Sequence, residues 1–263
     1  MQKLILITGS TDGIGLETAR KLSAKGHTII LHGRNPVKLD AAKKMLGGDV
    51  DGYVADLSKM ADVGDLAKSV IAEHQKIDVL INNAGVFKTP DPITADGLDV
   101  RFVVNTLAPY ALTLSLLPAM GPSGRIINLS SAAQAPVNLK ALAGQVRLAD
   151  MDAYAQSKLA ITIWSRELAK KLPDGPVVVA VNPGSLLASK MVKQGFGVAG
   201  NDLSIGADIL DRAALSDEFA TASGKYFDND AGRFAEPHSY ALDPQKSEEV
   251  MSVIEDVLAN TAR

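Results

Sequence analysis

The chain has 263 residues, of which 46% are hydrophobic and 22% are charged, a balance typical of a folded globular protein and not of a disordered or fibrous one. The net charge of −3 comes without a block of lysine or arginine, which argues against a nucleic-acid partner. The chain has no cysteine, which excludes disulfides and thiolate chemistry, and its four histidines lack the spacing of a metal site.

Short apolar runs alternate with amphipathic stretches along the whole chain. The predicted strands are residues 4–8, 27–33, 51–56, 78–85, 124–131, 177–184 and 224–227. The predicted helices are residues 14–24, 36–46, 59–75, 98–119, 151–172, 203–215 and 244–260. Because strands that alternate with helices form βαβ units, we predict the α/β class. The expected architecture is one doubly wound domain over residues 1–263, with helices on both faces of a parallel sheet.

The uncharged run from Phe102 to Gly124 is long enough to raise the question of a membrane span. Asn105, Pro109 and Pro118 within it favour a buried core helix instead. The first ten residues contain too few apolar residues for a secretory signal. We therefore expect no membrane partner and, given the absence of cysteine, a cytoplasmic protein.

Three glycines lie in the stretch GSTDGIG, between the first predicted strand and the first predicted helix. Such a turn brings backbone N–H groups and the positive end of a helix dipole to one point, which suits a pyrophosphate. The spacing is not the commoner G-x-G-x-x-G, and an ordinary strand-to-helix turn could also account for it. The candidate phosphate-binding residues are Gly9, Ser10, Thr11, Asp12, Gly13, Ile14 and Gly15.

The end of the second predicted strand indicates which nicotinamide cofactor would bind. An NAD site usually has a carboxylate about 20 residues past the glycines. This chain reads LHGRN there, and the guanidinium of Arg34 suits a 2′-phosphate. Against this, Asp12 could repel a phosphate and Arg34 could be a solvated loop residue. We favour NADP(H) over NAD(H).

Six motifs occur in order: TGSTDGIG, INNAG, VVNTLAP, GRIINLSS, a tyrosine and a lysine four residues apart, and VNPG. Together they resemble the short-chain dehydrogenase/reductase family over nearly the whole chain. Ser131 and Tyr154 are 23 positions apart, and this long spacing and the tail SGKYFDND are similar to retinol-dehydrogenase-like and protochlorophyllide-reductase-like members. The resemblance implies a single Rossmann-type domain with a seven-stranded parallel sheet.

The resemblance also implies the catalytic groups. Tyr154 would be the acid/base, Lys158 its electrostatic partner, Ser131 the ligand of the carbonyl oxygen and Asn105 the holder of a relay water. A cation about 4 Å from a phenol is worth about 4 kcal/mol at an effective dielectric of 20, so we expect Lys158 to lower the pKa of Tyr154 toward neutrality.

Cofactor contacts beyond the glycine turn follow from the same resemblance. Asp56 could instead cap a helix, and the asparagines after the fourth predicted strand could simply end it. A threonine often contacts the cofactor amide where this chain has Ser189, which puts that contact in doubt. The implied contacts are Asp56, Leu57, Asn82, Asn83, Ala84, Gly85, Tyr154, Lys158, Pro183, Gly184, Ser185, Leu186 and Ser189.

Two segments, residues 132–150 and 185–202, follow the carboxyl ends of predicted strands. Ligands bind at that edge of an open parallel sheet, so we predict that both are substrate loops. Leu139, Leu142 and Leu148 could line an apolar pocket there. Plain insertions are the alternative.

The leading hypothesis is an NADP(H)-dependent oxidoreductase that interconverts a carbonyl and an alcohol on a small to medium, apolar substrate, as a homo-oligomer (dimer or tetramer). The first alternative is a β-ketoacyl thioester reductase of fatty-acid or polyketide type. It would need a basic dock for a carrier, and only scattered Arg125, Lys140 and Arg147 are visible. The second is a non-catalytic NADP-sensing binding protein, although the chain keeps both Tyr154 and Lys158.

Overall fold

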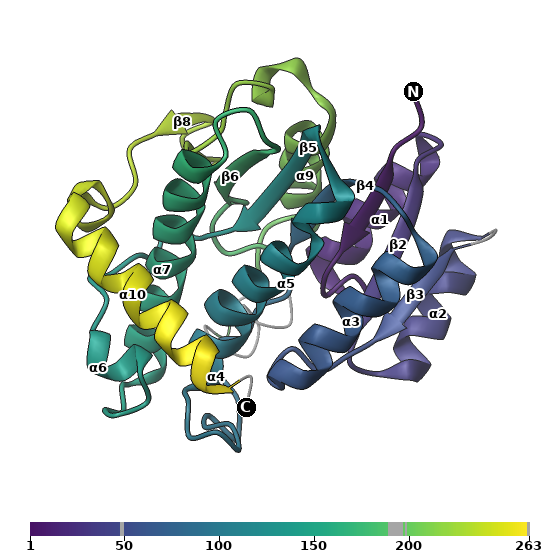
Figure 1. Cartoon of the computed structure of the whole chain (residues 1–263). Helices are drawn as coiled ribbons and strands as arrows, with labels where there is room; N and C mark the ends of the chain where they lie inside the picture. The colour runs from purple at the N-terminus through teal and green to yellow at the C-terminus, as the bar shows by residue number, and fades with distance from the viewer. Residues whose placement is uncertain (48–49, 189–196, 198, 262–263) are drawn as a thin grey trace.

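A single sheet runs through the molecule, which the computed structural model describes over residues 1–47, 50–188, 197 and 199–261 (Figure 1). Its strands are β1 (Leu4–Ile7), β2 (Thr28–Gly33), β3 (Asp51–Val54), β4 (Ile77–Asn82), β5 (Met120–Leu129), β6 (Val177–Asn182), β7 (Tyr226–Asp228) and β8 (Arg233–Ala235). Their order is β3-β2-β1-β4-β5-β6-β7-β8. All neighbours from β3 to β7 pair in parallel, and β8 pairs antiparallel with β7. The predicted parallel sheet is confirmed. The extra edge strand has three residues, too few for an alternating pattern to be recognised.

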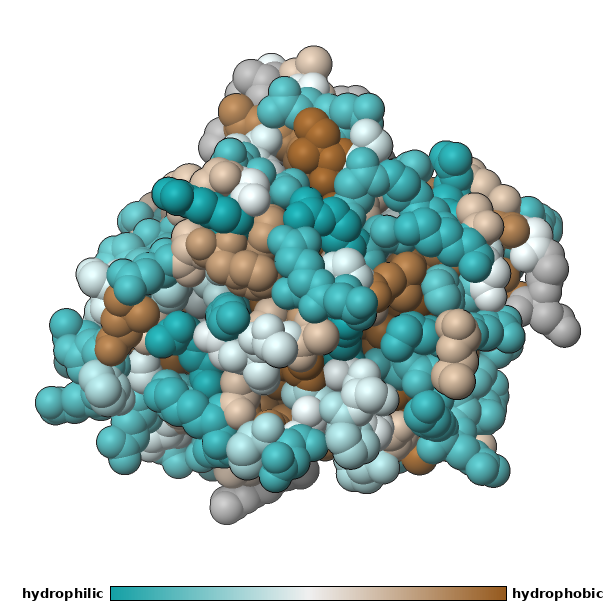
Figure 2. Space-filling model, turned by 90° about the horizontal axis from the view of Figure 1, so that it is seen from above, coloured by the Kyte–Doolittle hydropathy of each residue, from teal (hydrophilic) through white to brown (hydrophobic). Residues whose placement is uncertain are grey.

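Helices cover both faces of the sheet, as predicted. They are α1 (Gly13–Ala24), α2 (Pro36–Leu46), α3 (Met60–Glu73), α4 (Val100–Phe102), α5 (Ala108–Leu116), α6 (Leu139–Leu142), α7 (Asp150–Lys171), α9 (Leu203–Leu215) and α10 (Pro244–Thr261). Successive side chains of a strand point to opposite faces, so Leu6 of β1 packs into one core layer while Ile5 and Ile7 pack into the other. The layer around Leu6 is covered by α3, α5, α7 and α10, and the other layer by α1, α2 and α9. On the face seen in Figure 2, apolar residues form small separate groups in a mainly hydrophilic surface.

The helical stretch Val100–Ala119 is long and apolar enough to cross a membrane by length and composition, but 72% of its most apolar window is buried inside the protein. It is a core helix, as predicted. Residues Val103–Leu107 within it form a π-helical turn. Pro109 has no N–H to donate to the carbonyl of Asn105 four residues earlier, so the regular α-helical bonding cannot continue through this turn.

A buried ion pair joins this stretch to α7. The Arg101 side chain is 2% exposed and donates from Nε and Nη2 to the two carboxylate oxygens of Asp99, at 2.8 and 2.6 Å. Its Nη1 donates to Asp150, the first residue of α7. The hydrogen bonds and charge of Asp99 outweigh burial and raise the pKa of Arg101, so the guanidinium is firmly held in its charged form.

Arg101→Ala should lower the free energy of unfolding by about 3–5 kcal/mol, because it leaves the buried Asp99 carboxylate without its cation. Urea denaturation at pH 7, followed by circular dichroism, measures the loss. The matched control is Arg20→Ala, which removes an exposed pair with Glu17 and should lower stability by less than about 1 kcal/mol. Equal losses in the two variants would contradict the role of the buried pair.

Candidate active site

The glycine turn lies where β1 ends and α1 begins. Gly9 has φ +65°, and a Cβ on it would lie 2.8 Å from Cα of Ala84, so no other residue fits there without displacing the backbone. Gly13, the first residue of α1, also has a positive φ, +59°. The turn therefore needs glycine for its own conformation and for the close approach of the segment after β4.

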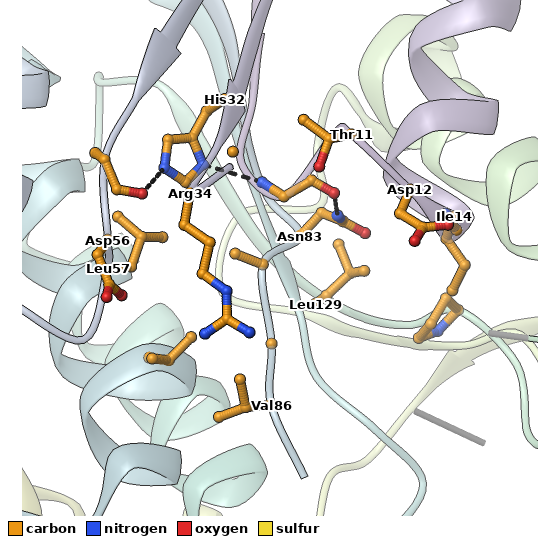
Figure 3. A pocket seen from close by; sticks show the side chains of 18 of the residues that line it. Thr11, Asp12, Ile14, His32, Arg34, Asp56, Leu57, Asn83, Val86 and Leu129 are labelled. Carbon is orange, nitrogen blue, oxygen red and sulfur yellow. Dashed lines mark hydrogen bonds between the residues drawn. The ribbon is translucent and has the colours of Figure 1, made fainter. Parts of the chain in front are cut away.

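Side chains from two neighbouring strands hold this turn (Figure 3). Asn83 donates from Nδ2 to the carbonyls of Thr8 and Gly9, at 2.9 and 3.0 Å. His32 accepts from the Gly9 N–H at 3.1 Å. Ser10 is fully buried and exchanges hydrogen bonds of 2.9 Å with the backbone of His32. Ser10 thus fastens β1 to β2 and does not line the cavity beside it.

A cavity of about 380 Å³ opens along the carboxyl ends of the strands. It brings together most of the predicted cofactor residues: Gly9, Thr11, Asp12, Gly13, Ile14, Arg34, Asp56, Leu57, Asn83, Ala84, Gly85, Tyr154, Lys158 and Pro183. Its lining also includes residues that the sequence analysis missed: His32, Gly33, Ala55, Val86, Val104, Leu129 and Ser130. Most of these are sequence neighbours of a predicted residue. Their place at the predicted strand ends is therefore a signal by which they could have been found.

Like Ser10, two further predicted residues, one in the glycine turn and one at a strand end, lie outside this cavity. Gly15 is inside α1 and packs against Asn83 and the backbone of Gly9. Asn82 is buried and donates to Asn128 and Thr113, at 2.8 and 3.1 Å, across the interior. Gly15 therefore packs against two residues that line the cavity, and Asn82 holds the end of β4 from the interior.

Arg34 follows β2, is exposed, and extends its guanidinium into the cavity (Figure 3). Asp56 faces it from the end of β3. Burial alone would raise the pKa of the Asp56 carboxyl, but hydrogen bonds from Ser58 and the charges of Arg34 and Lys59 outweigh burial and lower it. Asp12, which could repel a phosphate, is the N-cap of α1 and lies 3.6 Å from the ammonium of Lys38.

Tyr154 and Lys158 lie one turn apart on α7, at the inner end of the cavity. The Tyr154 ring packs against Phe87 with centroids 5.1 Å apart. Nζ of Lys158 lies 5.8 Å from the Tyr154 ring centroid and donates to the carbonyl of Leu129 at 2.7 Å. The Lys158 side chain is thus anchored to the end of β5.

The electrostatics differ from the expectation that Lys158 lowers the pKa of Tyr154. Burial raises the pKa of the Tyr154 phenol, and the hydrogen bond with Ser131 opposes this rise without cancelling it. Burial also lowers the pKa of Lys158 to about 8, because a desolvated ammonium is less stable than a neutral amine. The sequence-based expectation neglected this desolvation, which acts on both groups.

The two serines at the end of β5 have different surroundings. Ser130 is buried, and its hydroxyl is bonded to the Lys158 carbonyl at 3.0 Å and the Thr162 hydroxyl at 2.7 Å. The Ser131 hydroxyl, hydrogen-bonded to Tyr154, also accepts from the N–H of Ala133 at 3.1 Å. Only Ser131 presents its hydroxyl to the phenol.

Asn105 lies in the π-helical turn and does not line this cavity. Its side chain accepts from the N–H of Val86 at 2.8 Å and donates to the Val86 carbonyl at 3.0 Å. It also donates to the Ser157 hydroxyl at 3.0 Å. Both hydrogens of the Asn105 side-chain amide are therefore used within the protein, where they join the segment after β4 to α7.

A second cavity, of about 340 Å³, adjoins the first. The two share Ile14, Ser130, Tyr154 and Pro183. Apolar side chains dominate the rest of its described lining, and none of these residues is basic. The lining residues are Ile14, Phe87, Ser130, Ser131, Ala132, Ala133, Met151, Tyr154, Asn182, Pro183, Gly184, Ser185, Leu186 and Leu187.

Among the described residues of the two predicted substrate loops, only the first ones of each reach this cavity. Leu142 of α6 is fully buried in the core, and Leu139 and Leu148 pack against the same core. Ser189 and most of its C-terminal neighbours lie outside the described residues. The loop after β6 is fastened from the C-terminal part of the chain, since Asp230 accepts from the Ser185 N–H at 2.8 Å and from its hydroxyl at 2.5 Å.

A parallel sheet with a glycine turn at its switch point, and a half-buried tyrosine and a buried lysine beside it, defines a nucleotide-binding α/β enzyme. Residues 3–196 match the family model described as short chain dehydrogenase. Human retinol dehydrogenase 13 is 35% identical, with 86% of this chain and 76% of that protein covered. The chain therefore belongs to the short-chain dehydrogenase family, whose members are NAD(P)-dependent oxidoreductases.

Solved structures agree with this assignment. An uncharacterized protein from Mycobacterium paratuberculosis superposes with a TM-score of 0.82 at 29% identity, covering 98% of this chain and 94% of that one. A short-chain dehydrogenase from Escherichia coli CFT073, solved with NADPH, superposes with a TM-score of 0.71 at 26% identity, covering 86% and 96%. The retinol-dehydrogenase-like resemblance seen in the sequence is also borne out by the relatives.

Lys158→Met should stabilise the protein at pH 7 by about 2 kcal/mol, because it removes a buried ammonium and keeps the length of the side chain. The folded pKa of Lys158, about 8, is below that of an unfolded lysine, so wild-type stability rises as the pH goes from 8 to 10. The advantage of the variant should shrink over this range. Urea denaturation at pH 7, 8.5 and 10 measures it, with exposed Lys68→Met as control. A difference independent of pH would refute the assignment.

Proposed function

We propose that the chain is an NADP(H)-dependent oxidoreductase that interconverts a carbonyl and an alcohol on a small to medium, apolar substrate. One observation carries this proposal: Tyr154 lies at the junction of two cavities of different character. The first is lined by the glycine turn, Arg34 and Asp56, and the second mainly by apolar side chains. A proton-transferring group is thus positioned where a cofactor and a substrate would meet.

The first cavity fits NADP(H). The glycine turn admits close approach of a phosphate, and the start of α1 offers N–H groups there. Arg34 is exposed in the cavity and occupies the place at the end of β2 where an NAD site usually has a carboxylate. Its guanidinium would therefore contact a 2′-phosphate. The Escherichia coli relative solved with NADPH supports the same choice. When bound, NADP(H) supplies or accepts the hydride.

Tyr154 would move the proton at its phenolic oxygen. Burial keeps the phenol protonated, which is the form that donates a proton during carbonyl reduction. Ser131, bonded to this phenol, would donate a hydrogen bond to the substrate oxygen. Lys158 would be the electrostatic partner of Tyr154, and Asn105 would hold a relay water, although both hydrogens of its side-chain amide already have partners within the protein.

The second cavity favours an apolar substrate. Phe87, Met151, Leu186 and Leu187 are among its large apolar side chains, and the described lining offers no cation for a carrier phosphate. Arg125, which could have belonged to a basic dock, is buried and donates to the carbonyl of Ala213. These observations disfavour a carrier-bound β-ketoacyl thioester, and the relatives named retinol dehydrogenases agree with an apolar alcohol.

Three further features belong to this proposal. The start of each substrate loop, Ala132 and Ala133 in one and Ser185 to Leu187 in the other, would border the substrate. The protein would act in the cytoplasm, and as a dimer or tetramer. A spectrophotometric screen of apolar aldehydes and ketones, all-trans-retinal and acetoacetyl thioesters, each with NADPH and NADH, tests the activity. Binding of NADPH without turnover of any carbonyl would favour the NADP-sensing alternative.

Tyr154→Phe should reduce kcat at least a thousandfold and change the Kd for NADPH by no more than a few fold, because only the transferable proton is removed. Steady-state kinetics and fluorescence titration with NADPH measure the two effects. Tyr53→Phe, which removes a phenol bonded to Glu73 away from both cavities, is the control. Retention of most activity by Tyr154→Phe would exclude Tyr154 as the acid/base.

Arg34→Asp should shift the preference from NADPH toward NADH by about a hundredfold in the ratio of kcat/KM values, because it replaces a phosphate-binding cation by an acceptor for ribose hydroxyls. Kinetics with both cofactors measure this ratio. Arg20→Asp makes the same charge change on the exposed side of α1 and should leave the ratio unaltered. If the two variants behave alike, Arg34 does not contact the 2′-position.

A further inference from the structure

His32 is a buried titratable residue that the proposed mechanism does not use. It lies in β2, one residue before the strand ends, and is 3% exposed. Its ring forms part of the wall of the first cavity, beside Arg34 (Figure 3). Both ring nitrogens have partners: Nδ1 lies 3.1 Å from the amide nitrogen of Gly9, and Nε2 lies 3.1 Å from the carbonyl oxygen of Ala55.

These partners determine the protonation of the ring. The Gly9 amide can only donate, so Nδ1 must be unprotonated and accept. The Ala55 carbonyl can only accept, so Nε2 must carry the hydrogen and donate. His32 is therefore neutral, with its proton on Nε2. A doubly protonated ring would place an N–H against the Gly9 N–H.

The bond to Gly9 fixes the peptide that opens the glycine turn. On its other side, the Gly9 carbonyl accepts from Asn83. Both polar groups of Gly9 are thus satisfied by side chains, and its unusual φ is held before any ligand arrives. In this conformation the residues that follow, Thr11 to Ile14, line the first cavity. The Gly13 N–H among them donates to the Asp12 carboxylate at 2.9 Å.

We propose that His32 is a positioning residue for the cofactor: through Gly9 it sets the conformation in which the glycine turn binds the pyrophosphate. The inference rests on the proposed function, since it assumes that NADP(H) occupies the first cavity. The contact with Ala55 has a different consequence. It joins β2 to the end of β3 and stabilises the fold without directing the turn.

Two substitutions separate these contacts. His32→Asn can keep an acceptor at the position of Nδ1 and loses the reach to Ala55, whereas His32→Gln can keep a donor near the position of Nε2 and loses the acceptor for Gly9. Asparagine also leaves the larger void. If His32 has only a structural role, His32→Asn should weaken NADPH binding more than His32→Gln does. If His32 positions the glycine turn, His32→Gln should weaken NADPH binding more.

The test is the Kd for NADPH, measured by calorimetry, with the thermal midpoint of each variant recorded alongside. We expect His32→Gln to weaken NADPH binding about tenfold and His32→Asn by no more than about threefold, although both lower the thermal midpoint. The control is His27→Gln, because His27 accepts from the Lys3 N–H in the same way at the opposite end of β2. It should leave the Kd unchanged.

Equal Kd values for the two His32 variants, or weaker binding by His32→Asn, would overturn the proposal while the wild type still binds NADPH. Failure of the wild type to bind NADPH would overturn the proposed function itself. Nitrogen-15 NMR of histidine-labelled wild type gives a test that needs no variant. It should show His32 neutral with Nε2 protonated at pH 7, and the Nδ1–H form or a charged ring would also overturn the inference.

Discussion

The site depends on a buried ammonium, that of Lys158, which is held by the carbonyl of Leu129. Desolvation opposes this arrangement, as the lowered pKa of the lysine indicates. The fold supports it by joining α7 to the end of β5 through a second contact, in which the Ser130 hydroxyl binds the carbonyl of Lys158 itself. Because Tyr154 precedes Lys158 by one helical turn, the contacts that fix the lysine also fix the phenol between the two cavities. Stability and chemistry are therefore in conflict at this position.

The two cavities beside Tyr154 are built by different means. The first depends on backbone: its glycine turn has no room for a side chain at Gly9, and His32 and Asn83 hold that residue in place. The second is bounded by apolar side chains at the starts of two loops, such as Leu186 and Leu187. A backbone site suits a ligand common to a whole family, since it depends little on side-chain identity. A side-chain site can change its ligand by substitution while the sheet and the first cavity stay the same.

The parts of the site that sequence analysis could predict are those with a local signal. The glycine turn, Arg34 and the Tyr154–Lys158 pair each follow from a few neighbouring residues and their place at a strand end or on one helix. Burial has no such signal. Asn82 stands in a motif of cofactor-binding residues, yet its amide is used inside the core by Asn128. Desolvation likewise reversed the expected pKa shift of Tyr154, and Leu142, expected in a pocket, packs into the core through the short helix α6.

The remaining determinants come from the stretch SGKYFDND in the C-terminal part of the chain, outside the six ordered motifs. Side chains of this stretch bind backbone polar groups where the loops after β5 and β6 begin. Tyr226 donates to the Ser131 carbonyl at 3.1 Å, and Asp230 binds Ser185, 45 residues away in sequence. One segment thus fixes both the serine bonded to the phenol and the start of the loop after β6. Residues that line the second cavity can vary only while these anchors remain, so the C-terminal segment constrains the shape of that cavity.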